Sequence, residues 1–472
     1  MRTTIHCFST IALLFLSSLA AVHAAEKTPP DRFTVHEWGT FTTLQDDAGK
    51  ELAGVNIDDE PVPRFVHDLS PQLLSPAVLS SRYWAARMKG APQRHPLVTM
   101  RLETPVIYFY PPRGAQLPLQ VDVRVNFRGG WLTQFYPAAT PLLPLEQQGT
   151  FDFRHLTPQT VGGLAWTDLK VGVTGPGPAT DELVWLTPRN VTAASIASDN
   201  GETEKYLFYR GVGCQRSPLR ITTDRKTGQL TFFSNRQTTN SGEQRLGRVW
   251  LLHTRQDALC AWRGVDGLRL DAKPDQAQSS VSYRFTEKDF TTGNRARLEA
   301  EMHAALVADG LFADEAKALL GTWKWSYFTS AGLRAFYLVP RNWTDDVLPL
   351  TVSGQPVIQR VMVGRIELIT EEQQGLLSKL AKSTITPNAW LETIPESPAR
   401  EKFFAGRSTF GDLGVTIPAD FQIYLQLGRF RNALLIAEEA RRPTRGLTEF
   451  INNYQLRAFR APGAGGDAES ED

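Results

Sequence analysis

The sequence predicts an α+β fold: a β-sandwich-like N-terminal region, then a helical-hairpin and strand region, then a helical C-terminal part. Three observations support this prediction. Aromatic residues form 10% of the chain and are mixed with 36 glycines and 30 prolines, which is typical of short strands joined by turns. Apolar and polar residues alternate in several segments before residue 290. Near Asn294 this alternation gives way to apolar residues at helical spacing.

The N-terminus has the three parts of a cleavable secretory signal peptide. Arg2 supplies the positive charge, residues 11–22 form an apolar run, and small residues at Val22 and Ala24 predict cleavage after Ala24. The run of about 12 residues is shorter than the roughly 20 that a membrane-crossing helix needs. We therefore expect an exported protein, periplasmic or extracellular, with no integral membrane segment after cleavage.

The charge balance excludes one broad class of partner. The chain has 51 Lys and Arg against 50 Asp and Glu, and removal of residues 1–24 deletes only Arg2, which leaves 50 against 50. A general nucleic-acid binder carries an excess of basic residues, so no nucleic-acid partner is expected. The two cysteines of the remaining chain, Cys214 and Cys260, could form one disulfide or remain two free thiols.

After the signal peptide, changes of pattern divide the chain into four regions. These are a β-rich domain over 25–290, a mixed helix-hairpin and strand region over 291–385, a helical region over 386–461 and a disordered acidic tail over 462–472.

Within the β-rich domain, alternation predicts the strands one by one. It is clearest over Leu119–Phe127, where every second residue is apolar, as in a strand with one buried face. A hairpin loop is expected over Asp224–Gly228, and a helix over Ser75–Met88 interrupts the strands. The other expected strands are Arg32–Leu44, Val98–Tyr110, Asp181–Leu186, Lys205–Tyr209, Leu219–Thr223, Leu230–Phe233, Arg248–His253 and Val281–Phe285.

Beyond residue 290 the sequence predicts helices and strands together. An αα-hairpin of two helices is expected over Leu298–Ala308 and Asp314–Trp325. Further strands are expected over Leu333–Val339, Val357–Val363 and Arg365–Thr370. A helix then begins at Thr370, because Thr370 and Gln373 have the spacing of a capping box, and Pro418 is expected in the first turn of a later helix.

The first candidate site is the phrase that contains His36 and Glu37. An imidazole beside a carboxylate could bind a divalent metal or act as a catalytic base and its orienting group. In an extended strand, however, neighbouring side chains face opposite ways, so the two would meet only if Gly39 marked a bulge. Glu37 lies among apolar residues, which favours a buried Glu–Arg pair over a catalytic acid or a metal ligand.

Arginines beside aromatic residues or prolines at strand ends form a second candidate. If these strand ends lay together in space, they would form a rim of guanidinium groups and aromatic faces that suits an anionic or sugar ligand. The residues of this candidate rim are Arg128, Trp131, Arg210 and Arg341. The alternative is that each arginine binds its own neighbours.

Two weaker candidates have simpler explanations. Residues 58–60, with His67 and Asp68, are interpreted as a solvated turn more readily than as a cation site. Glu299 and His303 have the spacing of a surface pair on one helix. No zincin, serine-hydrolase or nucleotide-binding motif occurs in the sequence.

Four phrases resemble a family of secreted bacterial proteins that open with HEWGTFT just after the signal peptide. They are Val35–Thr42, Glu103–Tyr110, Phe208–Gly213 and Phe336–Asp345. The resemblance extends to about Thr370. It implies export and a single architecture, and because the family has no established activity, it transfers no catalytic residues.

Two functional hypotheses follow. The first is an extracytoplasmic hydrolase that acts on an envelope or environmental polymer, with Glu37 and His36 at its site, and it requires Glu37 to line an open cleft. The second is a non-enzymatic binding or scaffold protein of the cell envelope, which would hold a polysaccharide or a peptide at its aromatic and Arg-rich strand ends. The sequence leaves open the oligomeric state and whether a divalent metal is bound.

Overall fold

The computed structural model describes residues 30–57, 62–69, 71–80, 89–144, 151–235, 245–397 and 414–459. The expected signal peptide, the acidic stretch at residues 58–60 and the expected C-terminal tail lie outside these ranges. The helix expected from Ser75 begins as α1 (Pro76–Leu79), with Ser75 as its N-cap, and residues 81–88 are also outside the description. The fold is α+β, as the sequence predicts.

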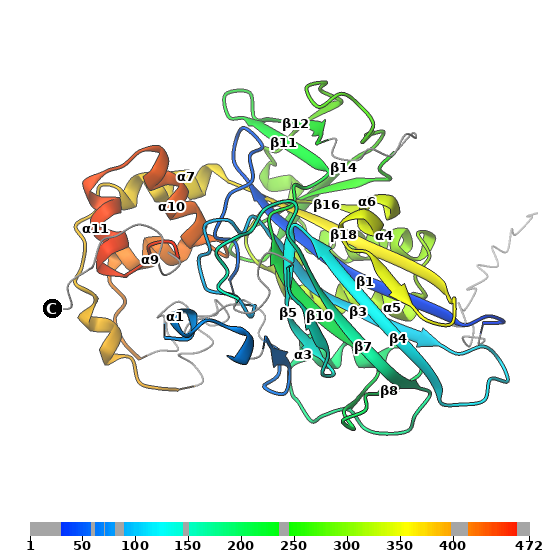
Figure 1. Cartoon of the computed structure of the whole chain (residues 1–472). Coiled ribbons are helices and arrows are strands. Elements are labelled where there is room, and N and C mark those ends of the chain that lie inside the picture. The colour runs from blue at the N-terminus through cyan, green and yellow to red at the C-terminus, as the bar shows by residue number, and fades with distance from the viewer. Residues whose placement is uncertain are drawn as a thin grey trace, which may run out of the picture.

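A large mixed sheet organises the molecule (Figure 1). Its central strand β1 (Thr34–Gln45) runs parallel to β18 (Val357–Leu368) and antiparallel to β3 (Met100–Tyr110). From β18 the sheet continues through β16 (Gly332–Val339) and β13 (Val249–Thr254). Strands from beyond residue 290 therefore lie in the same sheet as β1, so the sheet crosses the domain boundary that the sequence suggests there.

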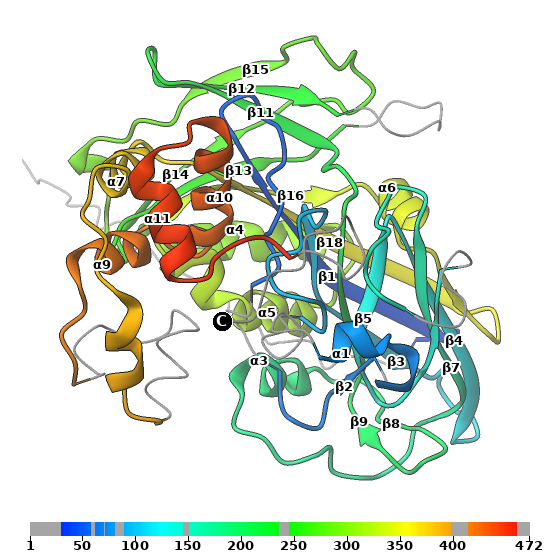
Figure 2. The same cartoon turned by 60° about the vertical axis from the view of Figure 1, so that its left-hand side comes forward.

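The sheet folds over on itself on the other side of β3. There the path runs through β10 (Leu207–Gly213), β5 (Gly130–Tyr136), β7 (Val161–Val171) and β4 (Leu119–Arg128). Apolar side chains of β4 and β7 join those of β1, β3 and β18 in one core. A small second sheet packs against the same core, and Figure 2 shows it above the main sheet. It consists of β11 (Leu219–Asp224), β12 (Gln229–Ser234) and β15 (Ser279–Ser282). The result is a two-layered β region.

Helices cover the opposite face of the central strands. One group contains α4 (Asn294–Ala308), α5 (Ala313–Thr322) and the π-helical turn η5 (Trp325–Thr329), and α4 with α5 forms the expected αα-hairpin. The other group contains α7 (Glu371–Leu380), α9 (Ala419–Gln426), α10 (Arg431–Arg441) and α11 (Arg445–Asn453), which stand together to the left in Figure 1. No helix among the described residues is long and apolar enough to cross a membrane.

The remaining elements are short and lie at the margins. The helical ones are η1 (Pro71–Leu73), α3 (Leu183–Leu186), η3 (Pro188–Asn190), η4 (Glu287–Asp289), α6 (Arg341–Val347) and η6 (Asn388–Thr393). The strands are β2 (His67–Asp68), β6 (Thr140–Leu142), β8 (Ile196–Ala197), β9 (Thr203–Glu204), β14 (Cys260–Val265) and β17 (Leu350–Val352).

Several local predictions are confirmed, and two are wrong. The alternation of β4, the hairpin between β11 and β12 and the capping box of Thr370 with Gln373 are all present. The strand expected over Asp181–Leu186 is instead helix α3, because a short apolar run does not distinguish a strand from a helix by periodicity. The two strands expected on either side of Gly364 are one strand, β18. A Cβ at Gly364 would lie 2.1 Å from the Tyr337 ring, so this glycine makes room for the ring.

Candidate functional site

Glu37 lies in the core between the two β layers, with 0% of its surface exposed. It is in register with Arg360 on β18, whose Nε donates a hydrogen bond to Glu37 Oε2. The Tyr209 hydroxyl donates to the other carboxylate oxygen. Burial and the charge of Glu37 both hold the pKa of Tyr209 well above its usual value. These contacts form the buried Glu–Arg pair that the sequence favours. They keep Glu37 out of contact with solvent, whereas a hydrolase site at Glu37 would need an open cleft.

His36 points to the helical face of the sheet, as the strand period predicts. Its Nδ1 lies 2.8 Å from Glu315 Oε2, and the Tyr110 hydroxyl donates to Glu315 Oε1 at 2.6 Å. The ring stacks on Phe312 at a centroid distance of 4.5 Å. A bulge does occur at Gly39, but His36 and Glu37 remain on opposite faces. The sequence does not single out Glu315 as a partner of His36. Its one recognisable feature is that it is the third residue of α5, where its carboxylate accepts a hydrogen bond from the backbone N–H of Phe312.

The proposed rim of arginines and aromatic rings does not form. Trp131 and Arg210 are each 1% exposed, and Arg210 donates to Gln134. Arg128 and Arg341 are exposed and bind neighbouring acids of α6, Asp346 at 3.2 Å and Asp345 at 2.7 Å respectively. The structure therefore places two of the four in the core and two at the surface, so they do not converge on one rim.

The weaker candidates also have local partners. His67 binds Glu202 at 2.7 Å. Glu299 faces Arg295 at 3.8 Å, and the ring of His303 contacts the Ala313 carbonyl at 3.0 Å. Cys214 and Cys260 are free thiols. Within the described ranges, no group of three or more His, Cys, Asp and Glu side chains is placed to hold a metal ion.

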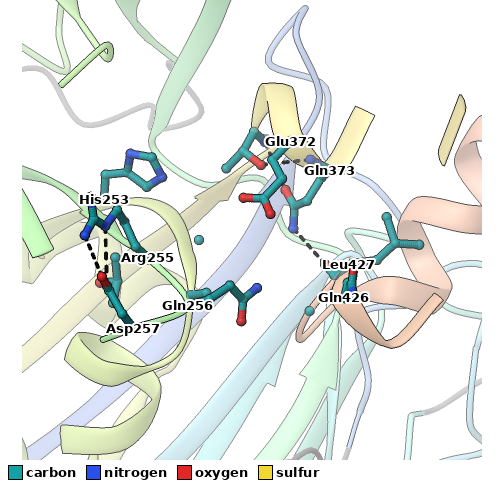
Figure 3. A pocket seen from close by; sticks show the side chains of 13 residues that line it. His253, Arg255, Gln256, Asp257, Glu372, Gln373, Gln426 and Leu427 are labelled. Carbon is teal, nitrogen blue, oxygen red and sulfur yellow. Dashed lines mark hydrogen bonds and ion pairs between the residues drawn. The ribbon is translucent and has the colours of Figure 1, made fainter. Parts of the chain in front are cut away.

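A pocket of about 390 Å³ lies where the end of the main sheet meets the C-terminal helices (Figure 3). Its walls come from the end of β13 and the turn that follows, from the start of β16, from the first turn of α7 and from the end of α9. Its lining residues are His253, Thr254, Arg255, Gln256, Asp257, Ala331, Gly332, Thr370, Glu372, Gln373, Gln426, Leu427 and Gly428.

Polar contacts fix the walls of this pocket. Gln373 completes the capping box of α7 and donates from Nε2 to the Leu427 carbonyl at 2.8 Å, which joins α7 to the end of α9. Gly332 has φ +143°, and a Cβ at this position would lie 2.8 Å from Arg334 Nη2. Arg334 in turn donates to four carbonyl oxygens, those of Ser326, Tyr327, Ser330 and Ala331. This part of the pocket therefore rests on a fully engaged guanidinium group.

Four polar side chains of the lining have no such partners. The side chains of His253, Gln256, Glu372 and Gln426 make no hydrogen bond to any other residue that the structure describes. Figure 3 shows Glu372 and Gln256 extending into the space between the two walls. Asp257 differs from them because Arg255 binds its carboxylate, with Nη2 to Oδ2 at 2.5 Å. The unengaged groups offer a ligand two amides, one carboxylate and one imidazole.

His253 is neutral near pH 7. Burial lowers its pKa from 6.5 to about 4, and the positive charges of Arg334 and Arg255 act in the same direction. A neutral imidazole both donates and accepts a hydrogen bond, whereas the imidazolium only donates. The pocket therefore presents mixed donors and acceptors at neutral pH.

The low pKa of His253 predicts a pH dependence of stability. The unfolded chain protonates this residue near pH 6.5 and the folded chain only near pH 4, so its contribution to stability is lost as the pH falls from about 6.5 to about 4. In urea unfolding across that range, His253→Gln should lose less stability than the unaltered protein. His303→Gln, at a half-buried histidine outside the pocket, is the control and should follow the unaltered protein. Identical pH dependence in all three proteins would contradict the prediction.

Comparison with known proteins does not place the chain in a family. No protein-family model and no curated protein sequence matches it. Among solved structures, the Fcho1 Mu homology domain of Danio rerio, with bound Eps15 peptide, aligns over 72% of this chain and 98% of its own. That alignment has 7% sequence identity and a TM-score of 0.26, so it carries no inference about fold or function.

Proposed function

We propose that the protein is exported and binds a polyhydroxylated ligand, a segment of an envelope or environmental polysaccharide, in the pocket of Figure 3. The observation that carries this proposal is that His253, Gln256, Glu372 and Gln426 line one pocket and their side chains have no hydrogen-bond partner in the described chain. The signal-like N-terminus supports the export part of the proposal.

The chemistry of the lining favours a neutral sugar. Each sugar hydroxyl donates one hydrogen bond and accepts others, and the side-chain amides and the neutral imidazole also do both. Glu372 accepts from two hydroxyls at once. Arg255 and Asp257 neutralise each other, so Glu372 is the one charge of the lining without a counter-charge in the described chain, and an anionic ligand would be repelled.

Hydrolysis is a second candidate activity at the same place. Enzymes that cleave glycosidic bonds commonly use two carboxyl groups, and Glu372 and Asp257 both line this pocket. Hydrogen bonds from Arg255 lower the pKa of Asp257, which keeps that group ionised. Asp257 would then be the anionic member of the pair, and Glu372 the second carboxyl group.

The test is Glu372→Gln. The variant keeps the shape of the side chain and loses its charge, so it should bind a neutral polysaccharide about tenfold more weakly, since a hydrogen bond to a charged group contributes about 1.5–3 kcal/mol. Affinity electrophoresis through gels that each contain one soluble polysaccharide, with dextran, xylan and glucomannan as neutral probes and alginate as the anionic one, measures the change. Glu396→Gln, at an exposed glutamate outside the pocket, should migrate like the unaltered protein.

The outcomes separate the two activities. Release of reducing ends by the unaltered protein, lost in Glu372→Gln and in Asp257→Asn, would establish hydrolysis. Retardation without such release would establish binding alone. Equal retardation of the unaltered protein and Glu372→Gln, or no retardation by any probe, would refute this pocket as the polysaccharide site.

A further inference from the structure

A second pocket, of about 540 Å³, lies on the outer face of the β region, where β4 ends and β7 begins. We call it the Arg128 pocket. It is lined by Asn126, Arg128, Pro158, Gln159, Val161 and Pro349. None of these residues lines the pocket of Figure 3, so the two sites are separate. Arg128 is the one residue of the candidate rim among them.

Strand pairing fixes the floor of this pocket. Asn126 and Arg128 alternate with the core residues of β4, so both side chains leave its outer face. Across the ladder, Arg128 is opposite Val161 and Asn126 is opposite Gly163. A Cβ at Gly163 would lie 2.6 Å from Asn126 Oδ1, so this glycine leaves room for the amide group against the sheet. One wall is held in place because the Pro349 carbonyl accepts from the backbone N–H of Asn126 at 3.0 Å.

The guanidinium group of Arg128 has an open edge. Its Nη1 donates to Asp346 Oδ1 at 3.2 Å, and both side chains are about half exposed, so this ion pair is weak. Its Nε and Nη2, which share one edge of the planar group, make no hydrogen bond to a residue that the structure describes. Arg248 uses the same edge to bind the two carboxylate oxygens of Asp266, at 2.9 and 2.8 Å. The open edge of Arg128 therefore suits a carboxylate that accepts two parallel hydrogen bonds.

The rest of the lining combines side-chain amides with apolar surface. The amides of Asn126 and Gln159 make no hydrogen bond to any described residue. Val161 is 41% exposed, and it supplies apolar surface together with the two prolines. Arg128 is the one charged residue of this lining. A ligand that matches these groups carries a carboxylate at one end and an apolar body beside it.

We propose that the Arg128 pocket binds a small organic acid, with one carboxylate and an apolar ring or chain. The carboxylate would accept from Nε and Nη2 of Arg128, and the apolar body would lie against Val161 and the two prolines. The volume is within the range of about 300–1,000 Å³ that is typical of small-molecule sites. This ligand is the opposite of the one proposed for the pocket of Figure 3, where the unmatched charge is that of Glu372, so neither proposal depends on the other.

The experiment is a titration of the whole protein with sodium benzoate, followed by saturation-transfer-difference NMR of the ligand at physiological ionic strength. Saturable binding is expected. Benzamide keeps the shape of benzoate without its charge, and it should bind about tenfold more weakly because the hydrogen bonds to Arg128 lose their charged acceptor. Acetate keeps the charge without the ring, and it should also bind at least about tenfold more weakly because it buries less apolar surface.

Strand β4 supplies a matched pair of variants. Arg128→Gln should bind benzoate about tenfold more weakly, and Arg128→Lys, which keeps the charge but not the planar edge, should be intermediate. The control is Arg124→Gln, at an exposed arginine on the same face of β4 that does not line the pocket. Four residues of strand place Arg124 about 13 Å from Arg128. That distance exceeds the screening length of about 8 Å, so this variant should stay within about twofold of the unaltered protein.

The proposal fails if benzoate does not saturate the protein, if benzamide or acetate binds as tightly as benzoate, or if Arg128→Gln and Arg124→Gln weaken binding equally. Glu372→Gln should bind benzoate like the unaltered protein, and a loss in that variant equal to the loss in Arg128→Gln would place benzoate in the pocket of Figure 3 instead. Arg128 is exposed, so its variants should unfold at the same urea concentration as the unaltered protein, and their weaker binding then reports on the site.

Discussion

Glu37→Gln should lower the free energy of unfolding by about 3–5 kcal/mol, because it leaves a buried guanidinium without its counter-charge. Arg360 is 3% exposed and donates Nε to Glu37, and its second link, to Asp345 at 2.9 Å, reaches an acid that is partly in solvent. The Tyr209 hydroxyl would also lose a charged acceptor. Urea unfolding at neutral pH measures the loss.

A double variant distinguishes the missing charge from a disturbed shape. Glu37→Leu together with Arg360→Met removes both charges and fills a similar volume, so it should recover much of the stability that Glu37→Gln loses. A Glu37→Gln protein within about 1 kcal/mol of the unaltered one would contradict this account, since an unpaired buried cation costs more than that. It would also reopen a chemical role for the carboxylate.

Arg334→Met should lower the free energy of unfolding by a comparable amount, about 3–5 kcal/mol, and should weaken ligand binding in the adjacent pocket as well. Its guanidinium serves four carbonyl oxygens around η5 and also Glu367. Methionine fills the volume and supplies no donor, so buried acceptors would be left unpaired. Thermal and urea unfolding, together with the polysaccharide-gel assay, measure the two effects.

Two further variants make the prediction specific. Arg334→Lys keeps the charge, but its single ammonium cannot reach the positions that the planar guanidinium reaches, so its loss should be intermediate. Arg341→Met, at an exposed arginine paired with Asp345, should cost about 1 kcal/mol or less. If Arg334→Met proved as mild as Arg341→Met, Arg334 would not be the support of the pocket that its contacts suggest.

The sequence predicts best what depends on local period and on capping. Strand alternation correctly separates His36 from Glu37, and the spacing of Thr370 and Gln373 correctly marks the start of α7. The same reasoning shows that Glu37 needs a cation. It cannot identify Arg360, because the parallel pairing of β1 with β18 joins residues that are 323 positions apart.

The pocket is harder to foresee, and so is the arginine cluster, the buried ion pairs of Arg101 with Glu103 and of Arg334 and Arg365 with Glu367. Each is assembled from separate segments of the chain. The pocket combines residues of β13, β16, α7 and α9, none of which carries a ligand-binding motif. The cluster does leave one signal. Arg101 with Glu103, and Arg365 with Glu367, share an Arg-x-Glu spacing that puts an ion pair on one face of a strand. That spacing indicates a row of charged side chains on one face of the strands. It does not indicate that helices bury this row.

The pairing of β1 with β18 also constrains how the chain reaches its native state. β1 can pair with its parallel neighbour only when the chain up to residue 368 is present, so this pairing in the middle of the sheet forms late. Contacts between residues so distant in the chain slow folding, because a long loop must be closed before the contact stabilises anything. In the meantime β1 presents an unpaired edge, which is a site for faulty association. A product truncated before β18 would keep that edge permanently, so the N-terminal β layers are not an independent folding unit.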